Sequence, residues 1–196
     1  MSKVHIWLRA ETKPDEQRTA LTPDGAESLL NAGFKVTIEC GSQSIFHQNL
    51  YKHLPVELAA EGSWINAPKD AIILGLKELP EDTFKLTHQH IYFAHAYKEQ
   101  SGWQNLLNRF KAGGGQLFDL EYLVDEHQRR VAAFGYWAGF SGAALAVLAW
   151  ANQQQSISPA LCEISSYANK QQLLVELEQA LSLCKNKPNV LVMGAK

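Results

Sequence analysis

Cysteine is scarce in this 196-residue sequence, and its three cysteines are too far apart to form a motif. Cys40, Cys162 and Cys184 include no CxxC pair, so the sequence offers neither a disulfide framework nor a thiolate zinc site. A reducing, cytoplasmic location is therefore expected. The amino-terminal residues also lack the uninterrupted apolar run that is typical of a secretory signal peptide.

An excess of either charge is missing too, because 18 lysines and arginines stand against 20 aspartates and glutamates. Without a basic patch or a polybasic cluster, the sequence predicts no nucleic-acid partner and no membrane binding. The exception among otherwise short apolar runs is the uncharged segment 134–151, which has GxxxG spacing at Gly135 and Gly139. Because this segment is rich in alanine and glycine, the pattern favours a buried helix over a membrane span.

What the sequence does contain is an alternation of strand-like and helix-like segments. Thr22, Pro23 and Asp24 supply an N-cap, a proline at the first helical position and an acidic first turn, so a helix is predicted over residues 23–32. The other predicted elements are strands at 4–8, 35–40, 71–76, 91–96 and 116–120, helices at 101–111, 134–151 and 169–185, a hairpin at 122–134 and a short helical turn at 49–52. This order predicts an α/β fold with a mostly parallel sheet and helices on both faces.

Two of the predicted strands end in groups that suit acid-base chemistry. Residues 71–76 are followed by Lys77, and residues 91–96 contain His95 near their end. Ligands of open α/β sheets bind outside the carboxyl ends of the strands, so we expect Lys77 and His95 to share one rim. A desolvated lysine and a histidine can exchange protons near neutral pH. The alternative from pattern alone is a solvated lysine and a core histidine bonded to a backbone carbonyl.

Two further patterns point away from additional ligand sites. His88, His90 and His95 suggest a metal, but His95 has the opposite strand parity and no carboxylate or cysteine completes the set, so no metal is expected. The glycine run 113–115 follows a predicted helix and precedes a strand. A phosphate-binding loop has the reverse order, so this run is interpreted as the end of the helix.

Several longer segments resemble the amino-terminal domain of the NAD-dependent, lysine-forming saccharopine dehydrogenases. These segments are GSWINAPKDAIILGLKELP, HIYFAHAYKEQSGW, EQRTALTP, and DLEYL followed by RRVAAFGYWAGFSGAAL. The resemblance to the amino-terminal domains of alanine dehydrogenase and transhydrogenase is looser. The resemblance to saccharopine dehydrogenase implies a Rossmann-like substrate domain of an enzyme that uses NAD to oxidise the secondary amine of saccharopine. Attack of water on the resulting imine would then release lysine and 2-oxoglutarate.

The resemblance also implies roles for individual residues. These are catalysis for Lys77 and His95, binding of substrate carboxylates for Arg18 and Lys98, and tuning of the proton affinity of the catalytic lysine for Glu78 and Glu121. Spacing alone favours a different interpretation of Arg18, as a surface arginine paired with Glu16 or Asp24.

The last residues bear on the cofactor. Residues 189–195 have the apolar pattern of a buried parallel strand, and in the resembled enzymes the matching strand opens the NAD-binding domain. Gly194, within this segment, is its only glycine before Lys196, so the glycine-rich turn that holds a pyrophosphate is expected to be missing. We therefore expect this chain alone to bind no NAD. The expected domains are a substrate domain at 1–133, a linking helix, connection and amphipathic helix at 134–188, and the first strand of a truncated dinucleotide-binding domain at 189–196.

Three hypotheses about function stay open. The chain is the substrate-binding half of a saccharopine dehydrogenase-like oxidoreductase, or a stand-alone module that binds an amino acid or a 2-oxo acid, or part of an alanine dehydrogenase-like enzyme. The resembling segments 64–77 and 134–145 favour the first hypothesis over the third. In each case the expected partner is a small molecule, and a separate nucleotide-binding chain or a second copy of this chain is expected besides.

Overall fold

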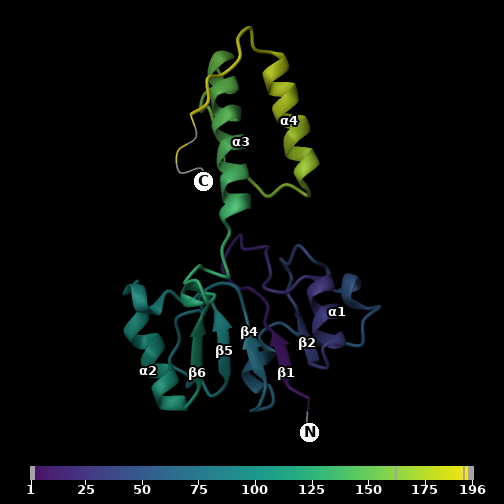
Figure 1. The fold of residues 1–196 in the computed structure, drawn as a ribbon, viewed down its shortest axis with the longest axis vertical. Helices are drawn as coiled ribbons and strands as arrows, with labels where there is room; N and C mark the ends of the chain where they lie inside the picture. Colours follow the sequence, from purple (N-terminus) through teal and green to yellow (C-terminus); the bar gives the residue numbers. More distant parts are fainter. Residues whose placement is uncertain (1–2, 162, 192, 194–196) are drawn as a thin grey trace. The chain divides into compact units, whose positions relative to one another are not determined.

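A computed structural model describes residues 3–161, 163–191 and 193, which divide into two compact units at residues 132 and 133 (Figure 1). The first unit is a six-stranded sheet in which each neighbouring pair of strands is parallel. Its strand order is β3-β2-β1-β4-β5-β6. The strands are β1 (His5–Leu8), β2 (Lys35–Cys40), β3 (Glu57–Ala60), β4 (Ile72–Leu74), β5 (Gln89–Tyr92) and β6 (Gln116–Asp119). This arrangement confirms the predicted α/β class and the parallel sheet.

The two helices of the first unit, α1 (Pro23–Asn31) and α2 (Trp103–Gly113), cover opposite faces of the sheet. Leu8 of β1 lies in the same apolar cluster as Ala26 of α1. The preceding residue, Trp7, packs instead against the cluster that contains Phe110 of α2. Because successive strand residues point to opposite faces, the two clusters lie on different sides of the sheet. The prediction of helices on both faces is therefore confirmed.

Helix α1 begins where the sequence pattern places it and ends one residue before the predicted end. The Thr22 hydroxyl accepts a hydrogen bond from the amide of Gly25 at 3.1 Å, and Pro23 occupies the first helical position. Ala26 faces the sheet and is fully buried. Gly33 follows the helix with a φ of 90°, a conformation that a residue with a Cβ adopts only under strain.

Strands β3, β4 and β5 differ from the prediction. No strand was expected between residues 41 and 66, yet β3 pairs with β2 over four residues. Its sequence ELAA lacks β-branched and aromatic residues, so pairing with β2 rather than local propensity makes it a strand. Strand β4 covers only three residues, and β5 ends at Tyr92 instead of continuing to residue 96. His95 adopts the left-handed conformation, with a φ of 51°, at the start of the 3-10 turn η3 (Ala96–Lys98).

Short turns fill the connections of this unit. The predicted helical turn at 49–52 is present as η1 (Gln48–Tyr51), and η2 (Ser63–Asn66) precedes β4. After β6, the turn η4 (Leu120–Tyr122) leads into a small antiparallel hairpin. The hairpin is formed by an isolated bridge between Val124 and Arg130, so the predicted hairpin is confirmed over its central residues.

Two of the three histidines considered as metal ligands lie in the apolar core. His90 is buried between the rings of Trp64 and Phe110, whose centroids are 5.2 and 5.3 Å from its own. This burial lowers the pKa of His90 to about 3, so the ring is neutral. His88 binds the carbonyl of Ala67 at 3.1 Å. Among the residues that the structure describes, no group of three or more His, Cys, Asp or Glu side chains is placed to hold a metal ion.

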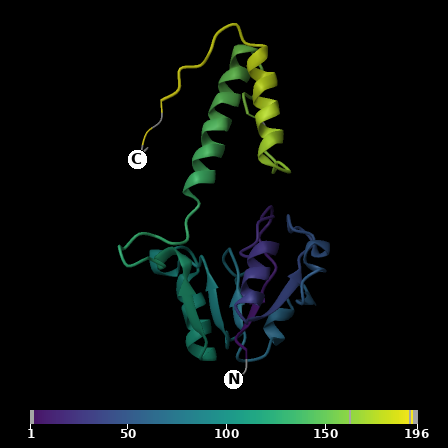
Figure 2. The ribbon, with the colours of Figure 1, turned by 45° about the vertical axis from the view of Figure 1, so that its right-hand side comes forward.

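The second unit consists of two helices, α3 (Gly135–Gln154) and α4 (Lys170–Ser182), that lie side by side (Figures 1 and 2). Their contact buries Leu148 of α3 and Leu173 of α4. The first turns of α3 are exposed, with Tyr136 at 69% and Trp137 at 55%, so the expectation of a buried helix is wrong for these turns. The described residues contain no helix that combines the length and the hydropathy of a membrane span.

The predicted strand at 189–195 is described only in part. Residues 189–191 and 193 do not form a strand, and residues 192, 194 and 195 lie outside the described residues. A parallel strand forms only beside another strand, and the second unit offers none among its described residues. The strand and the domain that it would open therefore stay predictions.

The end of α2 supplies a test of the packing. A Cβ added to Gly113 would lie 2.1 Å from the backbone oxygen of Leu86, whereas one added to Gly142 of α3 would meet no described atom within 4 Å beyond its chain neighbours and the local backbone of its own helix. A backbone carbonyl cannot turn aside, so Gly113→Ala should lower the free energy of unfolding of the first unit by about 2 to 3 kcal/mol. Urea unfolding followed on amide NMR signals of the sheet measures this loss.

Gly142→Ala is the matched control, because alanine is the better helix former at an open helical position. It should leave the unfolding midpoint of the sheet unchanged. Equal midpoints for wild type and Gly113→Ala would contradict the close packing of α2 on Leu86.

Candidate active site

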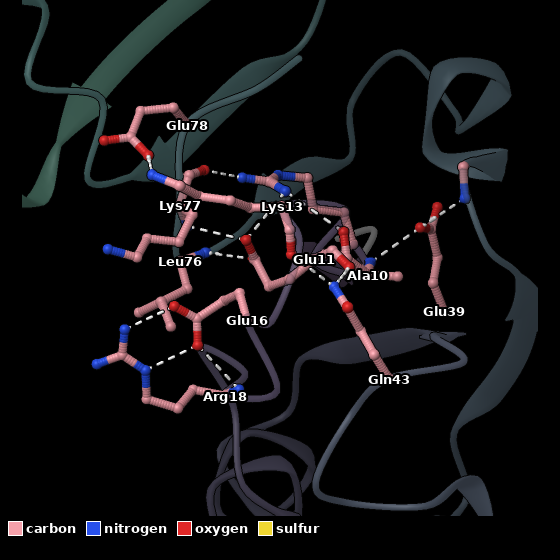
Figure 3. A network of polar contacts seen from close by, with 12 residues as sticks. Ala10, Glu11, Lys13, Glu16, Arg18, Glu39, Gln43, Leu76, Lys77 and Glu78 are labelled. Carbon is pink, nitrogen blue, oxygen red and sulfur yellow. Dashed lines mark hydrogen bonds and ion pairs between the residues drawn. The ribbon is translucent and has the colours of Figure 1, made fainter. Parts of the chain in front are cut away.

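A buried ion pair that follows β1 holds the end of β4. The side chains of Arg9 and Glu11 are 2% and 3% exposed, and Arg9 Nη1 lies 3.4 Å from Glu11 Oε2. The Glu11 carboxylate accepts hydrogen bonds from the amides of Leu76 at 2.7 Å and Lys77 at 2.9 Å (Figure 3). The Arg9 guanidinium donates to the carbonyl oxygen of Lys77. Both backbone polar groups of Lys77 are thus bound by this pair, which we call the Arg9–Glu11 clamp.

Gly75 makes room for the clamp. A Cβ at this position would lie 2.3 Å from Arg9 Nε, which is too close for any side chain. The guanidinium carbon of Arg9 also lies 5.4 Å from the centre of the Tyr92 ring, a favourable arrangement of a cation over an aromatic face. Arg9 is therefore enclosed by the ends of β4 and β5.

A second buried carboxylate, that of Glu39 at the end of β2, supports the segment that carries the clamp. It accepts hydrogen bonds from the amide of Ala10 at 2.9 Å and from the amides of Gly62 and Trp64 at 3.0 and 2.5 Å. The indole of Trp7 donates to it as well, at 3.1 Å. Glu39 therefore joins the ends of β1 and β2 to the turn η2.

His95 lies between two glutamates that come from the neighbouring strand ends. Its Nδ1 is 2.8 Å from Glu78 Oε1, and its Nε2 is 3.8 Å from Glu121 Oε2. Glu78 follows β4, His95 follows β5 and Glu121 lies in η4 after β6. A left-handed backbone costs a residue with a Cβ about 1 to 2 kcal/mol, so the surroundings must hold His95 in place.

Two cations bind the Glu121 carboxylate. Lys98 Nζ donates to one oxygen, and Arg130 Nη2 lies 2.7 Å from the other. The hydrogen bond from Lys98 outweighs burial and, with the charge of Arg130, holds the pKa of Glu121 below its ordinary value. We call Glu78, His95, Lys98, Glu121 and Arg130 the rim cluster.

Glu78 is ionised for a different set of reasons. Burial opposes its ionisation, but its own backbone amide and the His95 ring outweigh this effect and lower the pKa of Glu78. The ammonium of Lys13 lies 3.5 Å from the second oxygen of Glu78 and adds to the lowering. His95 therefore faces two carboxylates that are ionised at neutral pH.

Arg18 makes the pairing that its spacing predicts. Its Nε and Nη2 lie 2.7 and 2.6 Å from the two oxygens of Glu16, a two-pronged bond that lowers the pKa of Glu16 (Figure 3). The Arg18 side chain is 52% exposed and borders a cavity of about 180 Å³ under residues 41–44. Its role in binding a substrate carboxylate stays a prediction.

The structure brings together four of the six residues that the resemblance singles out, namely Glu78, His95, Lys98 and Glu121. Lys77 lies at the same edge of the sheet, because β4 and β5 are neighbours and the amide of Phe93 donates to the carbonyl of Leu76 at 3.1 Å. The ammonium of Lys77 makes no hydrogen bond or ion pair with another residue in the described ranges. Glu121 contacts His95 rather than this lysine.

Sequence reasoning gave no role to the clamp residues Arg9 and Glu11, or to Glu39 and Arg130. A signal for the clamp was present, since two opposite charges stand two residues apart directly after a buried strand. Glu39 gave no such signal, because its partners are more than 20 residues away along the chain. Arg130 pairs with Glu121, which lies nine residues earlier, through the turn η4 and the hairpin, and no local pattern marks that pairing.

A family model described as "Alanine dehydrogenase/PNT, N-terminal domain" matches residues 7–141. The chain belongs to this family. Two solved structures have a similar fold. A transhydrogenase from Sinorhizobium meliloti has a TM-score of 0.50 and 16% identity, in a match that covers 78% of this chain and 43% of the other. An L-alanine dehydrogenase has a TM-score of 0.53 and 17% identity, with 78% and 38% covered. These likenesses support the Rossmann-like fold.

Curated members resemble the chain more closely in sequence. A Schizosaccharomyces pombe protein named "Saccharopine dehydrogenase [NAD(+), L-lysine-forming]" is 50% identical, in a match that covers 97% of this chain and 54% of the relative. A protein of the same name from Yarrowia lipolytica is 49% identical, with 98% and 53% covered. The chain thus spans about half the length of the curated relatives it matches. The resemblance noted in the sequence is confirmed.

The ionised state of Glu78 leads to a prediction about acid stability. A carboxyl whose pKa is lower in the folded chain contributes stability above its unfolded pKa of about 4.3, and this stability is lost as the pH falls through the folded pKa. Glu78→Gln removes that contribution. The free energy of unfolding should then fall less steeply with acidification below about pH 5 in the variant than in the wild type.

Urea unfolding at a series of pH values measures the two slopes. Glu27→Gln, on the exposed side of α1, is the matched control and should keep the wild-type slope. A wild-type slope in Glu78→Gln would contradict a lowered pKa of Glu78 in the folded chain.

Proposed function

We propose that this chain is the substrate-binding half of a saccharopine dehydrogenase-like oxidoreductase. In the proposed reaction, saccharopine, NAD⁺ and water give L-lysine, 2-oxoglutarate, NADH and a proton. The observation that carries the proposal is the 50% identity to a protein of that name over 97% of this chain. The rim cluster supports it, because acid-base groups gather where open α/β sheets bind their ligands.

The rim cluster has the groups that such a reaction needs for proton transfer. Glu78 accepts only, so its bond to His95 Nδ1 favours the tautomer with the hydrogen on Nδ1. Nε2 is then free to accept a proton, and the nearby Glu121 carboxylate stabilises the imidazolium that results. Lys77, whose backbone is held by the clamp, supplies a second acid-base group at the same rim.

Lys98, Arg130 and Arg18 suit a substrate with several carboxylates. Lys98 and Arg130 are about half exposed and share the Glu121 carboxylate. Arg18 shares that of Glu16 in the same way. Each has a charge that a substrate carboxylate can also bind, and arginine offers a planar fork that matches a carboxylate.

We infer that the described residues do not hold NAD. The first-turn amide of Gly25 in α1 is capped by Thr22, and the described ranges contain no glycine-rich turn between a strand and a helix. NAD supplies the oxidation of the amine, and we infer that a nucleotide-binding partner outside these residues holds it.

Binding of an oxo acid tests the substrate side alone. 2-Oxoglutarate should bind weakly to the chain without nucleotide, and Arg18→Ala should remove most of the binding because a fixed guanidinium is lost. Ligand-observed NMR measures both. Arg129→Ala, which breaks an exposed arginine pair with Asp125, is the control and should bind like the wild type. Equal binding by wild type and Arg18→Ala would remove Arg18 from the site.

Catalysis is tested after a nucleotide-binding domain of the family has been supplied. Lys77→Met and His95→Gln should each lower kcat for saccharopine by roughly a hundredfold or more, the usual effect of a positioned acid-base group. The absorbance of NADH measures the rate. The exposed residues Lys85 and His53 provide the controls Lys85→Met and His53→Gln.

The two other hypotheses give different outcomes in this assay. Turnover of alanine without turnover of saccharopine would favour an alanine dehydrogenase-like enzyme. Binding of oxo acids with no turnover of either substrate would favour a stand-alone binding module.

A further inference from the structure

Asp119, the last residue of β6, joins the two strand ends that carry His95 and Glu121. Its Oδ1 accepts a hydrogen bond from the amide of Ala94 at 3.2 Å and another from the amide of Glu121 at 3.0 Å. The first amide belongs to the residue before His95, and the second belongs to the glutamate that faces His95 Nε2. One carboxylate oxygen therefore fixes the backbones of both groups.

The backbone segments at His95 and at Glu121 both need such a hydrogen bond to keep their conformation. His95 has the left-handed backbone conformation, which a residue with a Cβ leaves unless its neighbours hold it. Glu121 stands in the first turn of η4, and Asp119 is the N-cap of that short turn. A turn of three residues has few hydrogen bonds of its own, so the cap determines where the Glu121 side chain begins.

The second oxygen of Asp119, Oδ2, indicates that a contribution to stability does not by itself explain why an aspartate stands here. Oδ2 is buried and has no hydrogen-bond partner among the described residues, and the same is true of the hydroxyl of Tyr92, its cross-strand neighbour. A buried carboxylate oxygen without a donor destabilises a fold. Residues that carry such a cost are expected at functional sites.

We propose that Asp119 is a positioning residue that sets the separation and orientation of His95 and Glu121. Its effect on catalysis rests on the proposed function, whereas its effect on the two backbones does not. Asp119 touches neither Glu78 nor the imidazole ring itself in the contacts of the described residues. It acts through the amides on either side of the pair.

The test compares Asp119→Ala with Asp119→Asn. Asparagine keeps one oxygen, which can accept from both amides as Oδ1 does. Its amino group takes the place of Oδ2, which makes no hydrogen bond with the described residues. This variant should therefore keep the wild-type geometry without the charge. Alanine should speed hydrogen exchange at the amides of Ala94 and Glu121 by about tenfold or more. In the protein complemented with a nucleotide-binding domain, it should lower kcat by about a hundredfold, with KM within about twofold of the wild type.

Asp82→Ala is the matched control, because Asp82 also accepts from two backbone amides, those of Thr83 and Phe84. It should leave kcat and the exchange at Ala94 and Glu121 unchanged. Should the alanine variant not fold, Asp119→Ser replaces it. Serine keeps the N-cap of Glu121 but is too short for both amides, so it should speed exchange at Ala94 only.

Two results would overturn the proposal. The first is unchanged exchange at Ala94 in the alanine or serine variant. The second is an asparagine variant as slow in catalysis as the alanine variant, since that would assign the effect to charge instead of geometry. Absence of saccharopine turnover in the complemented wild type would refute the proposed function, and the exchange measurements would still decide the role of Asp119.

Discussion

The Arg9–Glu11 clamp is the interaction on which the site depends. Burying two charges is costly, and the hydrogen bonds to the backbone of Leu76 and Lys77 offset this cost for the Glu11 carboxylate and for Nη2 of Arg9. Nε of Arg9 is buried without a hydrogen-bond partner among the described residues. Removing either partner alone would leave an unpaired buried charge, at a cost of about 3 to 5 kcal/mol. The clamp joins the ends of β1 and β4, which are neighbours in the sheet. It thereby sets where Lys77 and Glu78 leave the sheet.

From that point the parallel sheet assembles the rest of the rim cluster. β4, β5 and β6 are consecutive in the sheet and parallel, so the residues after them meet at one edge. Each strand end contributes one member of the row of contacting side chains Glu78, His95 and Glu121. Hydrogen bonds from backbone amides to Glu11 and to Asp119 hold this row of three side chains at its two ends.

Much of this arrangement could be predicted from the sequence, because it follows from local patterns. The N-cap and proline of α1, the apolar runs of the strands and their parallel order led to the fold and placed Lys77 and His95 at one rim. The rest depends on contacts between distant residues. β3 has no strand propensity and exists through pairing with β2, and the left-handed backbone of His95 is imposed by its neighbours. The clamp looked like part of a polar loop because its partners lie about 65 residues away.

Amide hydrogen exchange at Leu76 and Lys77 in wild type and Glu11→Gln tests the clamp most directly. A glutamine has one acceptor oxygen in place of two, so it cannot receive both amides as the carboxylate does. The clamp predicts that at least one of the two amides exchanges about tenfold faster or more in the variant. The amide of Gly75, which donates to the carbonyl of Ile91 within the sheet, should keep its protection. Unchanged protection at both Leu76 and Lys77 would contradict the claim that Glu11 holds this strand end.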